Sequence, residues 1–279
     1  MRLGYNTNGF PQHRLEDVCR ILAELGYDGI AITPDVLQLD PFGSGARREA
    51  QGLRRLVDEL GLAVAVETGA RFVLDPRRKH QPTLLSEPAG AERRLDMLRR
   101  CLELAHVLGA ETFSFWAGTP EDGDATGGSD RDALLDRLCA GTSALLDAGA
   151  GESTRVCFEP EPGMLVASLA ELDGFLGRLG RPELAVMLDV GHVPVTETEP
   201  PDAVLRRLAP RLGGLQLDDS RDGVHEHLFP GDGEIDFGDV VAAAAAVGFT
   251  GLASLELPRH GHDPVRTAGR ALAFLRGLG

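Results

Sequence analysis

The chain has 279 residues, 43% hydrophobic and 25% charged, and its 28 basic and 43 acidic residues give a formal net charge of −15. This composition indicates a globular protein without the roughly 20-residue apolar run of a membrane span. The negative charge argues against a nucleic-acid partner, whose phosphates would be repelled. The N-terminal "MRLGYNTNGF" lacks the apolar core of a signal peptide, and four widely spaced cysteines suggest reduced thiols, so we expect a cytoplasmic protein.

One pattern recurs along the chain: a helical segment ends in glycine, and a short apolar run then ends in polar residues. It is clearest at residues 21–35, 56–69, 104–118 and 244–258, and looser at 145–161, 176–192 and 208–220. Glycine suits the end of a helix because it adopts a left-handed conformation without steric cost. The apolar run that follows is typical of a parallel strand buried on both faces.

With the N-terminal run, this pattern predicts eight strands, at residues 2–6, 29–33, 63–67, 111–116, 155–159, 184–189, 212–217 and 252–256. Helices lie between them, and a last helix is expected over 263–277. Eight βα units in this length predict one (β/α)8 TIM-barrel domain over residues 1–279. A doubly wound sheet is the alternative, but "YNTNGFPQ" lacks the glycine spacing of its phosphate-binding turn. The Gly- and Asp-rich segment 120–130 is interpreted as a mobile loop on the active face.

Polar side chains stand where four successive predicted strands end, the edge at which TIM barrels carry their chemistry. They are Glu159, Asp189, Gln216 and Glu256. Converging carboxylates would raise one another's pKa values, and a divalent cation removes that conflict. Oxygen ligands favour Mn²⁺ or Mg²⁺, tolerate Co²⁺ and suit Zn²⁺ less well. Helix capping or a surface salt bridge is the alternative explanation for any single one of these residues. It explains less well why four successive strands all end in such a residue.

These strand ends, together with "DVGH" (189–192) and "PGDGEIDF" (230–237), resemble the sugar isomerase and epimerase superfamily with a xylose isomerase-like TIM barrel. That superfamily, related to AP endonuclease family 2, includes hydroxypyruvate isomerase, tagatose/psicose epimerases, inosose and dehydroshikimate dehydratases, and endonuclease IV. The resemblance implies that "PGDGEIDF" turns beneath the site and that Asp236 caps the next helix. Endonuclease IV requires further metal ligands, and strands two and three end "TPD" and "ETG" here, which argues against DNA repair.

Matched residue by residue, the resemblance makes Glu159, Asp189 and Glu256 metal ligands, with Gln216 where histidine is frequent in the family. It implies proton transfer next to a carbonyl through an enediolate, with Glu159 and Glu256 as the acid–base pair. His192 matches a histidine that contacts the substrate or orients Asp189.

Several further residues are candidates for substrate contact. His227, with His225, stands in what is expected to be a polar loop, and Arg221 follows strand seven; for each, a solvated surface role is the alternative. Arg71 belongs to a basic cluster in the long segment after strand three, which suits anion capture or a surface contact.

Three more candidates stand at strand ends. Trp116 at the fourth strand can wall a sugar ring, although core packing is the alternative. Glu67 ends the third strand and Asn6 the first.

The leading hypothesis is a divalent-metal isomerase or epimerase of a small polyhydroxylated carbonyl compound, a sugar or cyclitol. Alternatives are a dehydratase acting on an inosose- or dehydroshikimate-like ketone, and a non-catalytic metabolite-binding barrel. The metal ligands alone do not choose among these outcomes. We expect no nucleic-acid or membrane partner and consider a homodimer possible.

Overall fold

Eight parallel strands pair side by side around a closed barrel, in the order β1-β10-β7-β6-β5-β4-β3-β2. The computed structural model describes residues 1–120 and 130–278, so most of the predicted loop at 120–130 lies outside the described residues. The barrel strands are β1 (Arg2–Asn6), β2 (Gly29–Ile32), β3 (Ala63–Glu67), β4 (Thr112–Phe115), β5 (Arg155–Phe158), β6 (Ala185–Asp189), β7 (Leu212–Leu217) and β10 (Leu252–Leu255). The predicted TIM barrel is therefore confirmed, with strand boundaries within about one residue of those expected.

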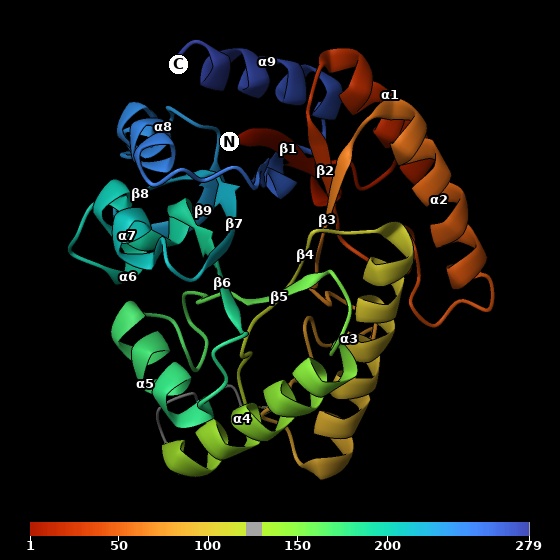
Figure 1. Ribbon diagram of the computed structural model, residues 1–279, viewed down its shortest axis with the longest axis vertical. Coiled ribbons are helices and arrows are strands. Elements are labelled where there is room, and N and C mark those ends of the chain that lie inside the picture. Colours follow the sequence, from red (N-terminus) through yellow and green to blue (C-terminus); the bar gives the residue numbers. More distant parts are fainter. Residues whose placement is uncertain (121–129, 279) are drawn as a thin grey trace.

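Helices form a ring around the barrel, which Figure 1 shows nearly end-on. They are α1 (Leu15–Leu25), α2 (Ala46–Leu60), α3 (Pro88–Leu108), α4 (Arg131–Ala148), α5 (Leu169–Leu179), α6 (Val193–Thr196), α7 (Pro201–Leu208), α8 (Phe237–Ala246) and α9 (Pro264–Arg276). Short 3₁₀ turns are η1 (Thr7–Gly9), η2 (Val190–His192) and η3 (Pro258–His260). None of the helices in the described part of the chain has the length and apolarity to span a bilayer.

The helix–glycine–strand pattern works locally as predicted. Gly26 follows α1 at φ 95°, and its N–H donates to the carbonyls of Leu22 and Ala23. The four residues of β2 that come after it are all buried, because the barrel interior covers one face and the helices cover the other.

The interior of the barrel is filled beneath the strand ends. A Cβ atom on Gly29 would lie 2.6 Å from Leu252 Cδ1, and one on Gly214 would lie 2.6 Å from Met187 Cε. Glycine at these positions thus makes room for large side chains that plug the barrel. The polar residues at the strand ends therefore stand on an apolar floor.

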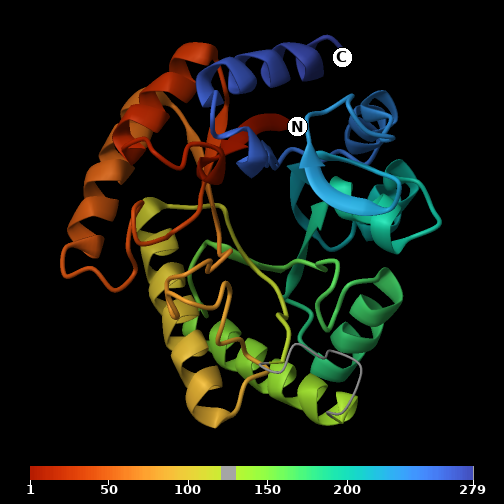
Figure 2. The same cartoon turned by 180° about the vertical axis from the view of Figure 1, so that it is seen from behind.

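The chain after β7 differs from the expected polar loop. It forms an antiparallel hairpin of β8 (Asp219–Arg221) and β9 (Val224–Leu228), which faces the viewer in Figure 2. The turn is Asp222-Gly223, with φ of 55° and 66°, a dipeptide typical of two-residue hairpin turns. His225 and His227 consequently lie on a strand, two residues apart and on one face.

Asp219 organises the "PGDGEIDF" segment beside this hairpin. Its buried carboxylate accepts hydrogen bonds from the backbone N–H groups of Gly231, Gly233 and Ile235 at 2.9, 2.9 and 3.1 Å. A Cβ atom on Gly233 would lie 2.2 Å from Asp219 Oδ1, so only glycine fits there. Asp236 then caps α8 by accepting from the N–H groups of Gly238 and Asp239, as expected.

Candidate active site

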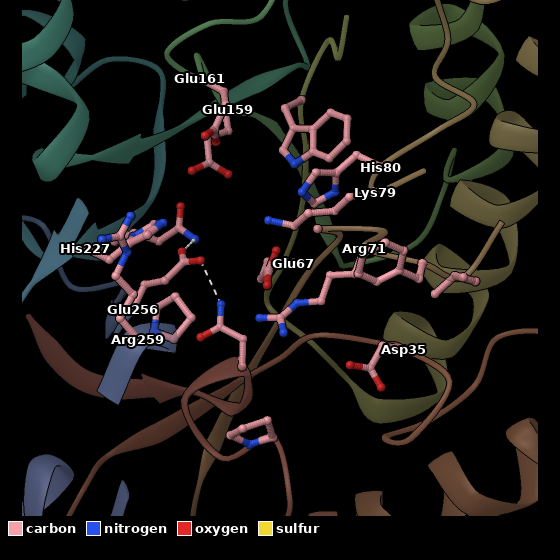
Figure 3. Close-up of a pocket in the computed structure, with 18 of the residues that line it drawn as sticks. Asp35, Glu67, Arg71, Lys79, His80, Glu159, Glu161, His227, Glu256 and Arg259 are labelled. Carbon is pink, nitrogen blue, oxygen red and sulfur yellow. Dashed lines mark hydrogen bonds between the residues drawn. The ribbon is translucent and has the colours of Figure 1, made fainter. Parts of the chain in front are cut away.

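A cavity of about 600 Å³ opens at the carboxyl ends of the barrel strands (Figure 3). Of the residues proposed from the sequence, its lining includes Glu67, Arg71, Trp116, Glu159, His192, Gln216, His227 and Glu256. Asp189 lies buried beneath this lining, 3.3 Å from His192 through its Oδ2 atom. Arg221 is exposed on β8 and is not part of the lining, so the structure does not bring it to the cavity.

Glu159 and Glu256 come from strands on different sides of the barrel. Glu159 follows β5 and is only 4% exposed. Burial and the nearby carboxylates of Glu161, Glu256 and Asp189 raise its pKa well above the usual value. Glu256 follows β10, where burial and the charge of Glu67 raise its pKa to about 8. Two carboxyl groups with raised pKa values therefore face one cavity.

Hydrogen bonds orient Glu256 from two sides. Asn8 Nδ2 donates to Glu256 Oε1 at 2.7 Å, and Gln216 Nε2 donates to Glu256 Oε2. The oxygen Oε1 of Gln216 is left buried without a partner among the described residues. Gln216 thus holds the glutamate with one end of its amide and presents an acceptor with the other.

Asp189 and His192 are held by the 3₁₀ turn η2. Asp189 Oδ1 accepts from Gly191 N–H at 2.8 Å, and His192 Nδ1 donates to the carbonyl oxygen of Pro160 at 2.9 Å. Burial opposes ionisation of Asp189, but nearby His192, His227 and His225 outweigh it and lower its pKa. The second carboxylate oxygen of Asp189 and Nε2 of His192 have no hydrogen-bond partner among the described residues.

Three imidazoles lie in a row beside this pair. The ring of His225 is 4.3 Å from that of His192 and 4.2 Å from that of His227. Burial and the neighbouring His192 lower the pKa of His225 to about 3. Burial opposes protonation of His227, but its hydrogen bond to Asp218 and the charges of Asp218, Glu256 and Asp189 together outweigh burial and raise its pKa to about 10. The row thus combines neutral and cationic imidazole.

Asn6 lies under the cavity and is not part of its lining. Its Nδ2 donates to Glu67 Oε1 at 3.3 Å, and its Oδ1 accepts from the N–H of Asn8 at 2.9 Å. Thr33 Oγ1 contacts the same oxygens of Asn6 and Glu67. Asn6 therefore orients two residues that do face the cavity, Glu67 and Asn8.

The donor atoms fit a divalent cation. Glu159, Asp189 and His192 each place one ligand atom within 4.8 Å of the others, and so do two groups that contain His225, whereas the predicted ligand Glu256 belongs to no such group among the described residues. Buried donor atoms without partners are costly unless a ligand satisfies them, and Asp189, His192 and Gln216 each have one here. Carboxylate, amide and imidazole donors together suit a first-row transition ion as well as Mg²⁺.

Sequence reasoning did not single out Glu161 as a site residue and left His225 open. Both line the cavity, and His225 Nδ1 is 3.6 Å from Glu161 Oε1. The signal for His225 was the Asp222-Gly223 hairpin turn, which puts it on the face of His227. Glu161 follows a strand-end glutamate by two residues, a weaker signal.

Comparison with known proteins supports this architecture. The family model described as "Xylose isomerase-like TIM barrel" matches residues 19–278. A D-psicose 3-epimerase of Enterocloster bolteae is 27% identical over 155 residues, which are 54% of this chain and 48% of that enzyme. The match thus spans about half the length of this curated relative.

Solved structures share the fold over nearly the whole chain. D-psicose 3-epimerase from Clostridium cellulolyticum H10, crystallised with D-tagatose, has a TM-score of 0.76 at 17% identity, covering 100% of this chain and 99% of that chain. 3-Keto-D-glucoside 4-epimerase from E. coli has a TM-score of 0.80 at 18% identity, covering 99% of this chain and 99% of that chain. An IOLI protein with a bound zinc atom has a TM-score of 0.76 at 15% identity, covering 99% of this chain and 98% of that chain. Because the family model covers residues 19–278, the chain belongs to the xylose isomerase-like TIM barrel family.

Proposed function

We propose that the protein is a divalent-metal-dependent sugar epimerase that exchanges a proton on the carbon next to the carbonyl of a ketose. The observation that carries this proposal is the pair of Glu159 and Glu256 at one cavity beside unpartnered metal-type donors. The relatives named as psicose 3-epimerase and keto-glucoside 4-epimerase act on carbonyl sugars, which agrees with this chemistry.

Glu159, Asp189, Gln216 and Glu256 would hold the cation, with Mn²⁺ or Mg²⁺ expected and Co²⁺ accepted. When bound, the cation would supply the positive charge that stabilises the carbonyl oxygen as the neighbouring C–H loses its proton. His192 donates from Nδ1 to the carbonyl oxygen of Pro160, and its Nε2 lies 3.3 Å from Asp189 Oδ2, so it would contact the substrate or orient Asp189.

Glu159 and Glu256 would act as the general acid and the general base. One of them takes the proton from one face of the substrate carbon, and the other returns a proton to the opposite face, so that the configuration inverts. Asn8 and Gln216 hold Glu256 by hydrogen bonds, which keeps its carboxylate aimed at the cavity. The apolar side of Trp116, which is buried and lines the cavity, would pack against the sugar.

Isotope exchange in D₂O tests this proposal. Ketohexoses incubated with Mn²⁺-loaded enzyme should gain deuterium at the carbon next to the carbonyl and form the epimer, as followed by NMR. Glu159→Gln and Glu256→Gln should each lower kcat by about 100-fold or more, because general acid–base catalysis contributes about 10²- to 10⁴-fold. Exposed Glu152→Gln serves as the matched control and should retain full activity.

Loss of water from the substrate would instead establish a dehydratase. Full activity of the Glu159→Gln, Glu256→Gln double variant would refute the acid–base assignment. A bound cation without proton exchange on any sugar would leave a metabolite-binding barrel as the function.

A further inference from the structure

Charged side chains are distributed unevenly around the cavity. Figure 3 shows Glu159, Glu161 and Glu256 on one side of the opening. Arg71 and Lys79 reach toward it from the other side, from the segment that follows β3. In a chain with a net charge of −15, this places two cations in the cavity wall opposite Glu159, Glu161 and Glu256, on the side where Glu67 also lies.

These two cations have no acidic partner among the described residues. Other basic residues nearby are paired: Arg78 Nε lies 2.8 Å from Asp75 Oδ2, and Arg259 Nη1 lies 3.1 Å from Glu226 Oε1. No carboxylate in residues 1–120 or 130–278 lies within ion-pair distance of Arg71 or Lys79. Their charge is therefore available to a ligand in the cavity.

A third cation stands behind the same wall. Arg94 of α3 is 1% exposed, and its guanidinium carbon lies 4.3 Å over the ring of Trp116. Its Nη1 has no hydrogen-bond partner among the described residues, and Nη2 has only a long contact of 3.5 Å to the carbonyl of Thr68. A buried cation without a counter-charge is unfavourable, so an anion bound near Arg94 would lower this cost.

The pKa of His80 is affected by all three of these cations. Its ring packs edge-on against Trp116, with centroids 5.2 Å apart. Burial, followed by the charges of Lys79, Arg94 and Arg71, lowers the pKa of His80 to about 3. Three positive charges thus act on one uncharged imidazole in the cavity wall.

We propose that Arg71 and Lys79, backed by Arg94, form an anion subsite that binds a phosphate or carboxylate group of the substrate. The substrate class is then an anionic ketose, with its carbonyl end between Glu159 and Glu256 and its anionic end against this basic wall. The orientation rests on the proposed function, whereas anion binding rests on the wall alone. The guanidinium of Arg71 can donate two parallel hydrogen bonds to either anion, and Lys79 adds a point charge at the mouth.

Substrate kinetics test the class of anion. Values of kcat/KM are compared for a neutral ketohexose, its terminal phosphate ester and a keto-sugar acid. The wild type should prefer one of the two anionic compounds, and whichever is preferred identifies phosphate or carboxylate as the group bound. Arg71→Met and Lys79→Met should each lower kcat/KM on it by about 10- to 100-fold, the loss expected for a charged hydrogen bond.

The same variants should lose less than about a third as much kcat/KM on the neutral sugar as on the preferred anionic one, since uncharged groups gain little from the wall. Arg77→Met is the matched control, because Arg77 is exposed in the same segment outside the cavity lining. Equal losses on neutral and anionic sugars, or a wild type that prefers the neutral sugar, would overturn the proposal.

Binding without turnover separates this inference from the proposed function. Trp116 is the only tryptophan of the chain, so its fluorescence reports the wall directly. Inorganic phosphate or malonate should change the emission of the wild type and of Arg77→Met, and added NaCl should weaken the effect. The Arg71→Met, Lys79→Met double variant should not respond. Anion binding without epimerisation would defeat only the proposed function, and epimerisation without anion binding would defeat only the subsite.

Discussion

At the scale of single residues, the candidate site concentrates ionisable groups that are buried or half-buried. Glu159 and Asp189 are 4% and 1% exposed, and neighbouring carboxylates raise the pKa of Glu159 after burial itself has done so. Asp189 keeps its charge because His192 and the N–H of Gly191 face it. The pKa values of two acids at adjacent strand ends are thus shifted in opposite directions by their different surroundings.

Substitution of Gly191 tests how closely the chain packs around Asp189 and Asp218. A Cβ atom there would lie 1.6 Å from Asp218 Oδ1, so Gly191→Ala must push Asp218 away and disturb η2. We expect a loss of about 1–3 kcal/mol in the free energy of unfolding, measured by urea denaturation, together with weaker binding of Mn²⁺. Gly177→Ala in α5 is the control: nothing lies within 4 Å of its Cβ position, and alanine should stabilise that helix by about 0.5–1 kcal/mol. Equal effects of the two changes would contradict the packing argument.

His80 predicts a pH dependence of stability. Burial and then the charge of Lys79 lower its pKa from 6.5 to about 3, so the folded protein keeps it neutral where the unfolded chain binds a proton. Above pH 6.5 both states are neutral and His80 has no effect. As the pH falls from 6.5 toward 3, stability falls by somewhat less than the ~1.4 kcal/mol per pH unit that one proton contributes, since the ring is partly exposed.

His80→Gln should remove this contribution. Its free energy of unfolding, measured by urea denaturation between pH 4 and 8, should decline less steeply below pH 6.5 than that of the wild type. Parallel curves for the two proteins would show that His80 is not held neutral.

At the scale of elements, the hairpin β8–β9 and the "PGDGEIDF" segment form one unit around Asp219. Its carboxylate accepts hydrogen bonds from the N–H groups of three residues along the segment, while β9 carries His225 and His227 to the cavity. A segment with so many glycines has a high conformational entropy when unfolded, so a fixed anion is needed to define its course. The two glycines and the aspartate are thus requirements of one local structure.

Asp219→Ala should destabilise the protein far more than removal of an exposed cap. It leaves four backbone N–H groups, including that of Ser220, without their charged acceptor, and we expect a loss of about 3 kcal/mol or more in the free energy of unfolding. Asp236→Ala removes the cap of α8 and should lower it by only about 1 kcal/mol. Urea denaturation of both variants checks the order, and a larger effect for Asp236→Ala would be inconsistent with the role of Asp219.

At the scale of the whole molecule, closure of the barrel assembles the candidate site. Strand β1 pairs with both β2 and β10, which brings Asn8 from the start of the chain to Glu256 near its end. Figures 1 and 2 show the same closure as the first and last helices, α1 and α9, lying side by side. Residues separated by 248 positions meet, so the site exists only in the folded barrel.

Cation binding should therefore stabilise the whole fold. A ligand that binds only the folded state at 100 times its Kd adds about 2.7 kcal/mol, so Mn²⁺ should raise Tm and EDTA should reverse the change. Asp189→Asn should abolish most of this shift in Tm, measured by calorimetry, because it removes one buried charged ligand. An equal shift in Asp189→Asn would place the cation elsewhere.

The sequence by itself determined the barrel and the residues at its strand ends. Helix-ending glycines such as Gly26 and apolar runs such as β2 are local signals, and parallel strands in a barrel end at one face. Glu159, Gln216 and Glu256 could therefore be assigned to one cavity before any contact was known, whereas their chemical roles remain predictions.

Only the tertiary structure decided which side chains face that cavity and which do not. It turned the expected loop into a hairpin that brings His225 beside His192 and leaves Arg221 in solvent, and it placed Asn6 beneath Glu67. The reason is geometric: the direction of a side chain beyond a strand end depends on turns and on contacts with distant strands. Those contacts arise from barrel closure, which no short stretch of sequence encodes.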